Sequence, residues 1–296
     1  MRYGTPYKGS KNAIAPWVVS WLPSAAHLYD LFAGGCAVTH CAMLTGWWKD
    51  IVINDIDDGP RLFLDGIDGK YRNETRWISR EDFYKLKDSD PYIRYCWSFG
   101  NNGRDYLYGR EIEPWKKALH YARVFHDTSL LRAMGIDSDG SRKDIKKHYA
   151  EYCKKLRLDC SQAGMQRHDA IVRLGRVQSL ENLHDCQRPR LYQKDYREVP
   201  ILTNSVIYCD IPYQGKNPYS EAFNYERFFN WCERQTELVI VSSYAMPEDR
   251  FLCIAEVPKR CTYSATNSLR TIEKLFIPVH QKALFEKMWE ATPVDR

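Results

Sequence analysis

The stretch LYDLFAGGCAVTHCAMLTGWWKDIVIND, residues 28–55, contains two apolar runs separated by a glycine pair and a helix-like segment. LYDLFAGG (28–35) is typical of a buried strand that ends in a tight turn, and AVTHCAMLTGW (37–47) then predicts a helix. DIVIND (50–55) predicts a second strand that ends at an acid. Together these features indicate the first β-α-β unit of a doubly wound sheet, with Asp55 about 20 residues after the glycines. Because G-x-G-x-x-G is absent, a dinucleotide is not indicated.

The strand pattern returns only in the last third of the chain. NSVIYCD (204–210), TELVIVSS (236–243) and KLFIP (274–278) predict buried strands, with a helix expected over residues 220–235. Between about residue 60 and residue 198 the pattern is mostly helical. Residues 141–159 predict a helix rich in lysine, for which a solvated basic face and a DNA-contacting face are equally good interpretations.

This order of elements predicts an α/β fold with an insertion. We expect a Rossmann-like catalytic domain formed by residues 1–60 and 190–296. Residues 61–189 are expected to form an inserted, mostly helical domain.

The basic residues are unevenly distributed along the chain. The formal net charge is +5. Residues 104–197 contain 20 Lys and Arg against 13 Asp and Glu, an excess of +7, so the remainder of the chain carries −2. A basic segment of this kind favours contact with nucleic acid phosphates.

Composition also argues against several classes of protein. The 10 cysteines have irregular spacings without a Cys-x-x-Cys motif, which favours reduced cytoplasmic thiols over a zinc site or a disulfide framework. No run of about 20 apolar residues exists to span a bilayer. We therefore expect a cytoplasmic protein without a metal or a membrane anchor.

Polar or glycine residues follow three of the predicted strands. These are the segment from Asp30 to Gly35, Asp55, and the segment from Asp210 to Tyr213. In an open α/β sheet, ligands bind outside the carboxyl ends of the strands. Each feature alone also has a simpler interpretation, because a glycine can form a turn and an acid can cap a helix.

Taken in order with YKGSK (7–11), these motifs resemble a known family. YKGSK, DLFAGG, NDID, a long insertion and CDIPY follow the arrangement of the amino-group DNA methyltransferases of the adenine-N6 type, in the alpha subgroup typified by the Dam enzymes. The resemblance covers roughly residues 1–60 and 190–280, and a phage-like or prokaryotic origin accompanies it. It implies methyl transfer from S-adenosylmethionine to adenine N6 in double-stranded DNA, in the cytoplasm.

The resemblance also implies a set of cofactor contacts. Asp55 can accept hydrogen bonds from the ribose hydroxyls, and glycine backbone can pass close to the methionine portion. Lys11 can pair with the methionine carboxylate. The cofactor-binding residues implied are Tyr7, Lys11, Phe32, Gly34, Asp55, Asp195 and Asp210.

The catalytic tetrapeptide is Asp-Ile-Pro-Tyr, residues 210–213, where the family usually has Asp-Pro-Pro-Tyr. The Asp210 carboxylate and the backbone carbonyl of Ile211 can accept both N6 hydrogens as positive charge develops on the nitrogen. Isoleucine supplies this carbonyl as proline does, and Pro212 still fixes its own φ. Tyr213 is expected to stack on the flipped adenine. Cys209 is expected to be buried. The chain contains no Pro-Cys dipeptide, which a cytosine-C5 methyltransferase would require for its nucleophile.

Within the basic segment, WSFGNNGRDYLYGR (97–110) combines glycine, asparagine, aromatic and arginine residues. The resemblance places a DNA-contacting loop here, and a purely structural loop is about equally favoured. The candidate DNA-binding residues are Asn101, Asn102, Arg104 and Arg110. The target sequence, a role in a restriction-modification system and the oligomeric state are not encoded in these patterns, although a monomer is expected.

Two other functions fit parts of the pattern. A related tetrapeptide also serves planar amides, so an RNA or protein-glutamine N-methyltransferase is one alternative. The second alternative is a DNA-binding regulator that has lost activity, and the isoleucine at position 211 of the tetrapeptide is the feature that suggests it.

Overall fold

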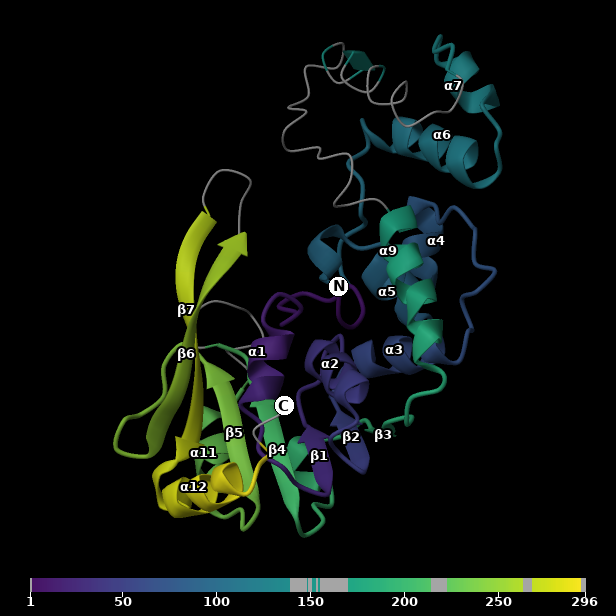
Figure 1. Ribbon diagram of the computed structural model, residues 1–296. Coiled ribbons are helices and arrows are strands. Elements are labelled where there is room, and N and C mark those ends of the chain that lie inside the picture. The colour runs from purple at the N-terminus through teal and green to yellow at the C-terminus, as the bar shows by residue number, and fades with distance from the viewer. Residues whose placement is uncertain are drawn as a thin grey trace. The chain divides into compact units, whose positions relative to one another are not determined.

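The computed structural model describes residues 2–138, 148, 151, 152, 154, 170–213, 223–262 and 268–293. The chain divides into two compact units. The first unit comprises Met1–Thr5, Gly9–Asp68 and Leu180–Arg296, and the second comprises Pro6–Lys8 and Gly69–Ser179. The first unit is therefore built from both ends of the sequence, and Figure 1 shows purple N-terminal strand β1 beside green β4.

The first unit is organised around one sheet, whose seven strands among the described residues have the order β3-β2-β1-β4-β5-β7-β6. Its parallel strands are β1 (His27–Asp30), β2 (Asp50–Asn54), β3 (Arg190–Tyr192), β4 (Ser205–Asp210) and β5 (Leu238–Ser243). The antiparallel strands β6 (Phe251–Thr262) and β7 (Ser268–Pro278) complete one edge. All five predicted strands are present, although β1 ends at Asp30 and not at the glycine pair as predicted; β3 and β6 were not predicted.

Alternate side chains of the parallel strands enter two apolar clusters, one on each face of the sheet. On β4, Tyr208 belongs to the first cluster, and Cys209 belongs to the second. Cys209 is fully buried as predicted, and this burial raises the pKa of its thiol. The first cluster includes residues of α1 (Ala15–Ser20), α2 (Ala37–Thr45), α3 (Gly59–Ile67) and α12 (Lys282–Glu290). The second includes residues of α11 (Tyr225–Glu233).

The two predicted helices of the first unit are present with shorter bounds. Helix α2 ends at Thr45 because Gly46 adopts φ +66°, a left-handed conformation that closes a helix. Helix α11 begins after Asn224, whose side chain accepts a hydrogen bond from the Arg227 N–H. Residues 220–222 of the predicted segment lie outside the described residues. So does the predicted lysine-rich helix over 141–159, apart from residues 148, 151, 152 and 154.

The second unit consists mainly of short helices in its described residues. They are α4 (Arg80–Leu86), α5 (Pro91–Cys96), α6 (Glu113–Val124), α7 (Ser129–Ala133) and α9 (Ala170–Gln178). Helices α6 and α7 share an apolar cluster around the fully buried Trp115. Arg173 of α9 is also buried, and its guanidinium donates to the carbonyls of Cys96 and Ser98. This arginine therefore ties α9 to the start of the segment 97–110.

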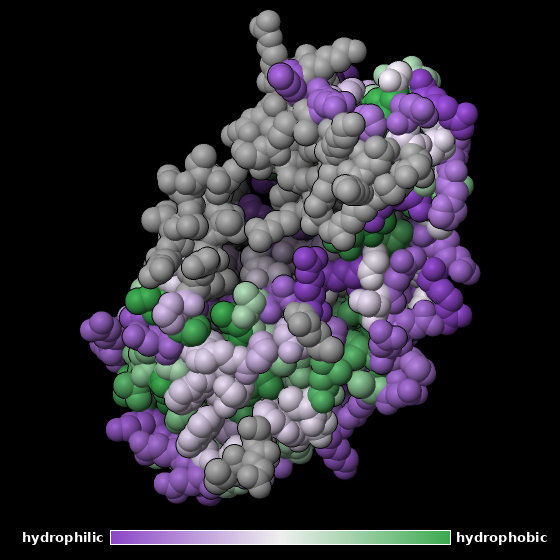
Figure 2. Space-filling model, turned by 45° about the horizontal axis from the view of Figure 1, so that its top comes forward, coloured by the Kyte–Doolittle hydropathy of each residue, from purple (hydrophilic) through white to green (hydrophobic). Residues whose placement is uncertain are grey.

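The surface in the view of Figure 2 is mostly hydrophilic where residues are coloured, with hydrophobic side chains in separate patches. Among the described residues, no helix has both the length and the apolar character needed to cross a bilayer.

The N-terminal residues pack directly on the glycine turn after β1. The Thr5 N–H donates to the Gly35 carbonyl at 2.7 Å, and the Gly4 N–H donates to Nδ1 of His40 at 2.9 Å. Gly4 has φ +66°, and a Cβ at this position would lie 2.2 Å from the Gly35 oxygen. Only glycine permits this approach, so residues 3–5 hold the turn in place.

We predict that Gly4→Ala lowers the free energy of unfolding by several kcal/mol, because it adds a backbone clash to left-handed strain. Gly9→Ala is the matched control. Gly9 has φ +83° with no atom within 4 Å of an added Cβ, so strain alone, about 1–2 kcal/mol, is expected there. Urea unfolding of both variants measures the difference. Equal losses would contradict the proposed close packing.

Candidate active site

The sheet has a switch point between β1 and β4, because β2 lies on the other side of β1 and β5 lies on the other side of β4. The two central strands end at Asp30 and Asp210. Both carboxylates therefore reach the carboxyl edge where ligands bind in doubly wound sheets.

Asp210 is held by a lysine from the N-terminal segment. The Lys11 ammonium donates to Oδ1 of Asp210 and lies 3.8 Å from Oε1 of Glu273. The Lys11 side chain is 3% exposed and that of Asp210 is 20% exposed. The ammonium also lies 4.9 Å from the centre of the Tyr213 ring. Three of the predicted site residues thus meet at one point.

Tyr213 is held through both its hydroxyl and its ring. Its hydroxyl donates to Oε1 of Glu273 at 2.5 Å, and Oδ1 of Asp210 lies 3.3 Å away. Its ring packs on Tyr244, with the ring centres 4.3 Å apart. Burial, together with the two carboxylates, raises the pKa of the Tyr213 phenol well above its ordinary value. The phenol therefore remains a hydrogen-bond donor at neutral pH.

Glu273 is the site residue that sequence reasoning missed. Its side chain is fully buried, and Oε1 also accepts a hydrogen bond from the Ser242 hydroxyl at 2.7 Å. The available signal was an acid directly before the run KLFIP, at even spacing from the buried Leu275 and Ile277. This spacing places Glu273 on their face of the strand, but only the sheet pairing brings it to Asp210.

A second group of predicted residues meets at the turn after β1. Gly34 has φ +48°, and its N–H donates to Oδ2 of Asp55 at 2.8 Å. The Asp57 N–H donates to the other oxygen of Asp55 at 3.0 Å. Burial raises the pKa of Asp55 to about 6, and these N–H groups oppose the shift. Two backbone N–H groups therefore fix the orientation of the Asp55 carboxylate after β2.

Asp30, the last residue of β1, directly precedes this turn and is almost fully buried. The Thr39 hydroxyl donates to its Oδ2 at 2.7 Å. Burial raises the pKa of Asp30 to about 7, and the nearby charges of Asp210 and Asp55 add to the effect.

The remaining predicted cofactor residues have other partners. Phe32 packs in an aromatic cluster with Tyr196, 5.3 Å between ring centres. Asp195 accepts hydrogen bonds from the Arg197 backbone and guanidinium, which lower its pKa. Tyr7 belongs to the second unit, where its ring lies 5.1 Å from that of Tyr95.

The asparagines of segment 97–110 stabilise the loop itself. Asn101 donates to the Tyr95 carbonyl, and Oδ1 of Asn102 accepts from the N–H groups of Arg104 and Asp105. The side chains of Arg104 and Arg110 are exposed. The two asparagines therefore stabilise the fold of the loop, and the two arginines present positive charge at its surface.

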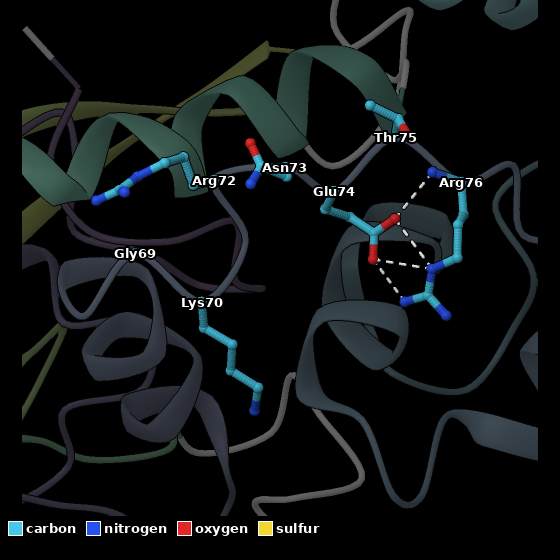
Figure 3. A pocket seen from close by; sticks show the side chains of 7 residues that line it. All are labelled: Gly69, Lys70, Arg72, Asn73, Glu74, Thr75 and Arg76. Atoms are coloured by element: carbon cyan, nitrogen blue, oxygen red, sulfur yellow. Dashed lines mark hydrogen bonds and ion pairs between the residues drawn. The ribbon is translucent and has the colours of Figure 1, made fainter.

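A polar hollow in the second unit is lined by seven residues, which are Gly69, Lys70, Arg72, Asn73, Glu74, Thr75 and Arg76. In Figure 3, Arg76 folds against Glu74, whereas Lys70 and Arg72 extend away from that pair. The hollow contains none of the predicted site residues. Its surface nevertheless carries cations that sequence reasoning did not select.

The mostly parallel sheet with carboxylates at its switch point places the protein among the doubly wound α/β folds, a class in which ligands commonly bind at the carboxyl edge. Residues 7–63 match the family model described as D12 class N6 adenine-specific DNA methyltransferase. This match confirms the resemblance, and it confirms the prediction of an adenine-specific DNA methyltransferase. No curated protein matches the chain.

We predict that Asp30→Asn raises the free energy of unfolding, relative to the wild type, by more at pH 8 than at pH 5. The folded-state pKa of about 7 exceeds the ordinary value of 3.8, so the folded protein holds the extra proton. Ionisation of Asp30 therefore lowers stability as pH rises from about 4 to about 7. An asparagine remains neutral, and its carbonyl can accept from Thr39.

Denaturant unfolding at both pH values measures this difference. Asp68→Asn is the control, because Arg188 lowers the pKa of Asp68 and both pH values lie above it. Its effect should be the same at pH 5 and pH 8. An Asp30→Asn effect that is also independent of pH would disprove the assignment.

Proposed function

We propose that the protein transfers a methyl group from S-adenosylmethionine to N6 of an adenine flipped out of duplex DNA. The observation that carries the proposal is the group formed by Asp210, Lys11 and Tyr213 at the carboxyl end of β4. The family match to residues 7–63 supports the DNA substrate and the adenine specificity.

The residues at the end of β1 and β2 suit the cofactor. Asp55 presents an acceptor whose orientation is set by the N–H groups of Gly34 and Asp57, which fits two ribose hydroxyl donors. Ile56 is 79% exposed and offers apolar surface beside it, which suits the face of an adenine ring. S-adenosylmethionine, when bound, supplies an electrophilic methyl group on a sulfonium. We propose Tyr7, Lys11, Phe32 and Asp195 as further cofactor contacts.

The segment 210–213 suits the target amine. Adenine N6 is a weak nucleophile because its lone pair is delocalised into the ring. The Asp210 carboxylate and the carbonyl of Ile211 would accept its two hydrogens and favour the developing charge. The Tyr213 ring, held through its hydroxyl, would stack on the base. No covalent intermediate with the protein is required.

We propose that residues 61–189 form the target-recognition domain. The compact second unit supports this proposal, as does the basic excess in the middle of the chain. Arg104 and Arg110 are exposed in segment 97–110, and Lys70 and Arg72 are exposed in the hollow. Such side chains suit phosphate oxygens. Asn101 and Asn102 are proposed to present this loop to DNA.

We predict that the wild-type protein forms N6-methyladenine in duplex DNA and that Asp210→Ala lowers its rate by at least about 10³-fold. The pure protein is incubated with labelled S-adenosylmethionine and a mixture of DNA, RNA and protein, and the products are digested. Asp68→Ala is the control for removal of an acid elsewhere. Label confined to RNA or glutamine would contradict the proposal, as would bound cofactor without any transfer.

We predict that Ile211→Pro keeps methyltransferase activity within a few-fold but unfolds at a lower temperature. Ile211 is 3% exposed and packs in the second apolar cluster, so proline removes core contacts worth about 2–3 kcal/mol. Its catalytic contribution is a carbonyl that proline also has. Ile211→Val, expected to cost about 1 kcal/mol, is the packing control. A folded proline variant without activity would disprove the role of the carbonyl.

A further inference from the structure

We propose that Glu273 is a second active-site carboxylate that receives the Lys11 ammonium when Asp210 binds the target amine. The inference rests on the proposed function, since it concerns the same reaction. Glu273 would act as a positioning residue, because it contacts Lys11 and Tyr213 rather than the reacting atoms.

The antiparallel direction of β7 explains how this acid reaches the catalytic edge. Strand β5 ends at Ser243, which pairs with Lys274 of β7. Residues of β7 that precede Lys274 therefore extend past the carboxyl end of β5. Glu273 is the first of them, and its side chain lies on the face that also carries Asp210 and Ser242.

Lys11 is placed between the two carboxylates. Its ammonium bonds to Oδ1 of Asp210 and lies 3.8 Å from Oε1 of Glu273. A shift of about 1 Å would bring the second pair to hydrogen-bond distance. A buried ammonium that loses its anion carries a large desolvation penalty. Glu273 would remove this penalty when the adenine amine takes the place of the ammonium on Asp210.

Glu273 also accepts a hydrogen bond from the Tyr213 hydroxyl. A hydroxyl has one hydrogen, and the Tyr213 hydroxyl lies closer to Oε1 of Glu273 than to Oδ1 of Asp210. The Ser242 hydroxyl donates to the same Glu273 oxygen. The hydroxyls of Tyr213 and Ser242 thus both donate to Glu273, so the tyrosine hydrogen does not occupy the Asp210 carboxylate that would accept from the target amine.

The test compares two substitutions that separate charge from shape. Glu273→Gln retains the size of the side chain but removes its charge, whereas Glu273→Asp retains the charge on a shorter side chain. We expect single-turnover methylation of duplex DNA to fall about 30-fold or more in the glutamine variant and to recover substantially in the aspartate variant. The KM for S-adenosylmethionine should change less than about threefold in both.

Two controls define the interpretation. Glu256→Gln removes an exposed acid on β6, opposite Lys274, and should leave the rate unchanged. Lys11→Met should make the further loss from Glu273→Gln small, because Glu273 acts through Lys11. Circular dichroism and thermal unfolding establish that each variant is folded.

The outcomes distinguish this inference from the function on which it rests. A wild-type protein that makes no N6-methyladenine would overturn both. An active wild type with an equally active Glu273→Gln variant would overturn the inference alone. A glutamine variant faster than the aspartate variant would indicate that shape matters rather than charge, and it would also overturn the proposal.

Discussion

The ion pair between Lys11 and Asp210 joins the N-terminal segment to the end of the central strand β4. Removal of one partner from a buried pair costs about 3–5 kcal/mol, because the other charge is left without compensation. The same segment leads directly into α1 through a turn in which the Lys11 carbonyl accepts from the N–H of Ile14, the residue before the helix. Residues of α1 then pack in the first apolar cluster. Residue 11 therefore joins the Asp210 carboxylate, through its ammonium, to the helix that covers one sheet face, through its backbone.

The carboxyl edge of the sheet concentrates negative charge. Four carboxylates belong to strands or strand ends that meet there: Asp30, Asp55, Asp210 and Glu273. Burial disfavours their charged form, which is why the pKa values of Asp30 and Asp55 are raised. Such an edge favours cations. Lys11 supplies one from the chain itself, and the proposed sulfonium would supply another. The electrostatics of the edge are thus consistent with a positively charged cofactor.

Local patterns were sufficient for the central strands but not for the whole site. β1, β2, β4 and β5 are apolar runs, and the predicted ends of β2, β4 and β5 lie within one residue of the observed ends, whereas β1 ends at Asp30 and not at the glycine pair. β3 has three residues and β6 is half-exposed where its side chains are described, so neither gives a clear periodic signal. Glu273 and Gly4 were missed for a different reason. Their importance comes from neighbours far away in the sequence, Asp210 and Gly35, which no local pattern contains.

The departure at Ile211 follows from the alternation of side chains along β4. Asp210 lies on the face that carries Lys11, so the next residue must point to the opposite face. There Ile211 is buried with residues of β5 and α11. A proline would fill this space less completely, whereas its carbonyl would be the same. The isoleucine therefore contributes to the core through its side chain and, in the proposed reaction, to the target amine through its backbone. Because one role uses the side chain and the other uses the backbone, the two do not compete.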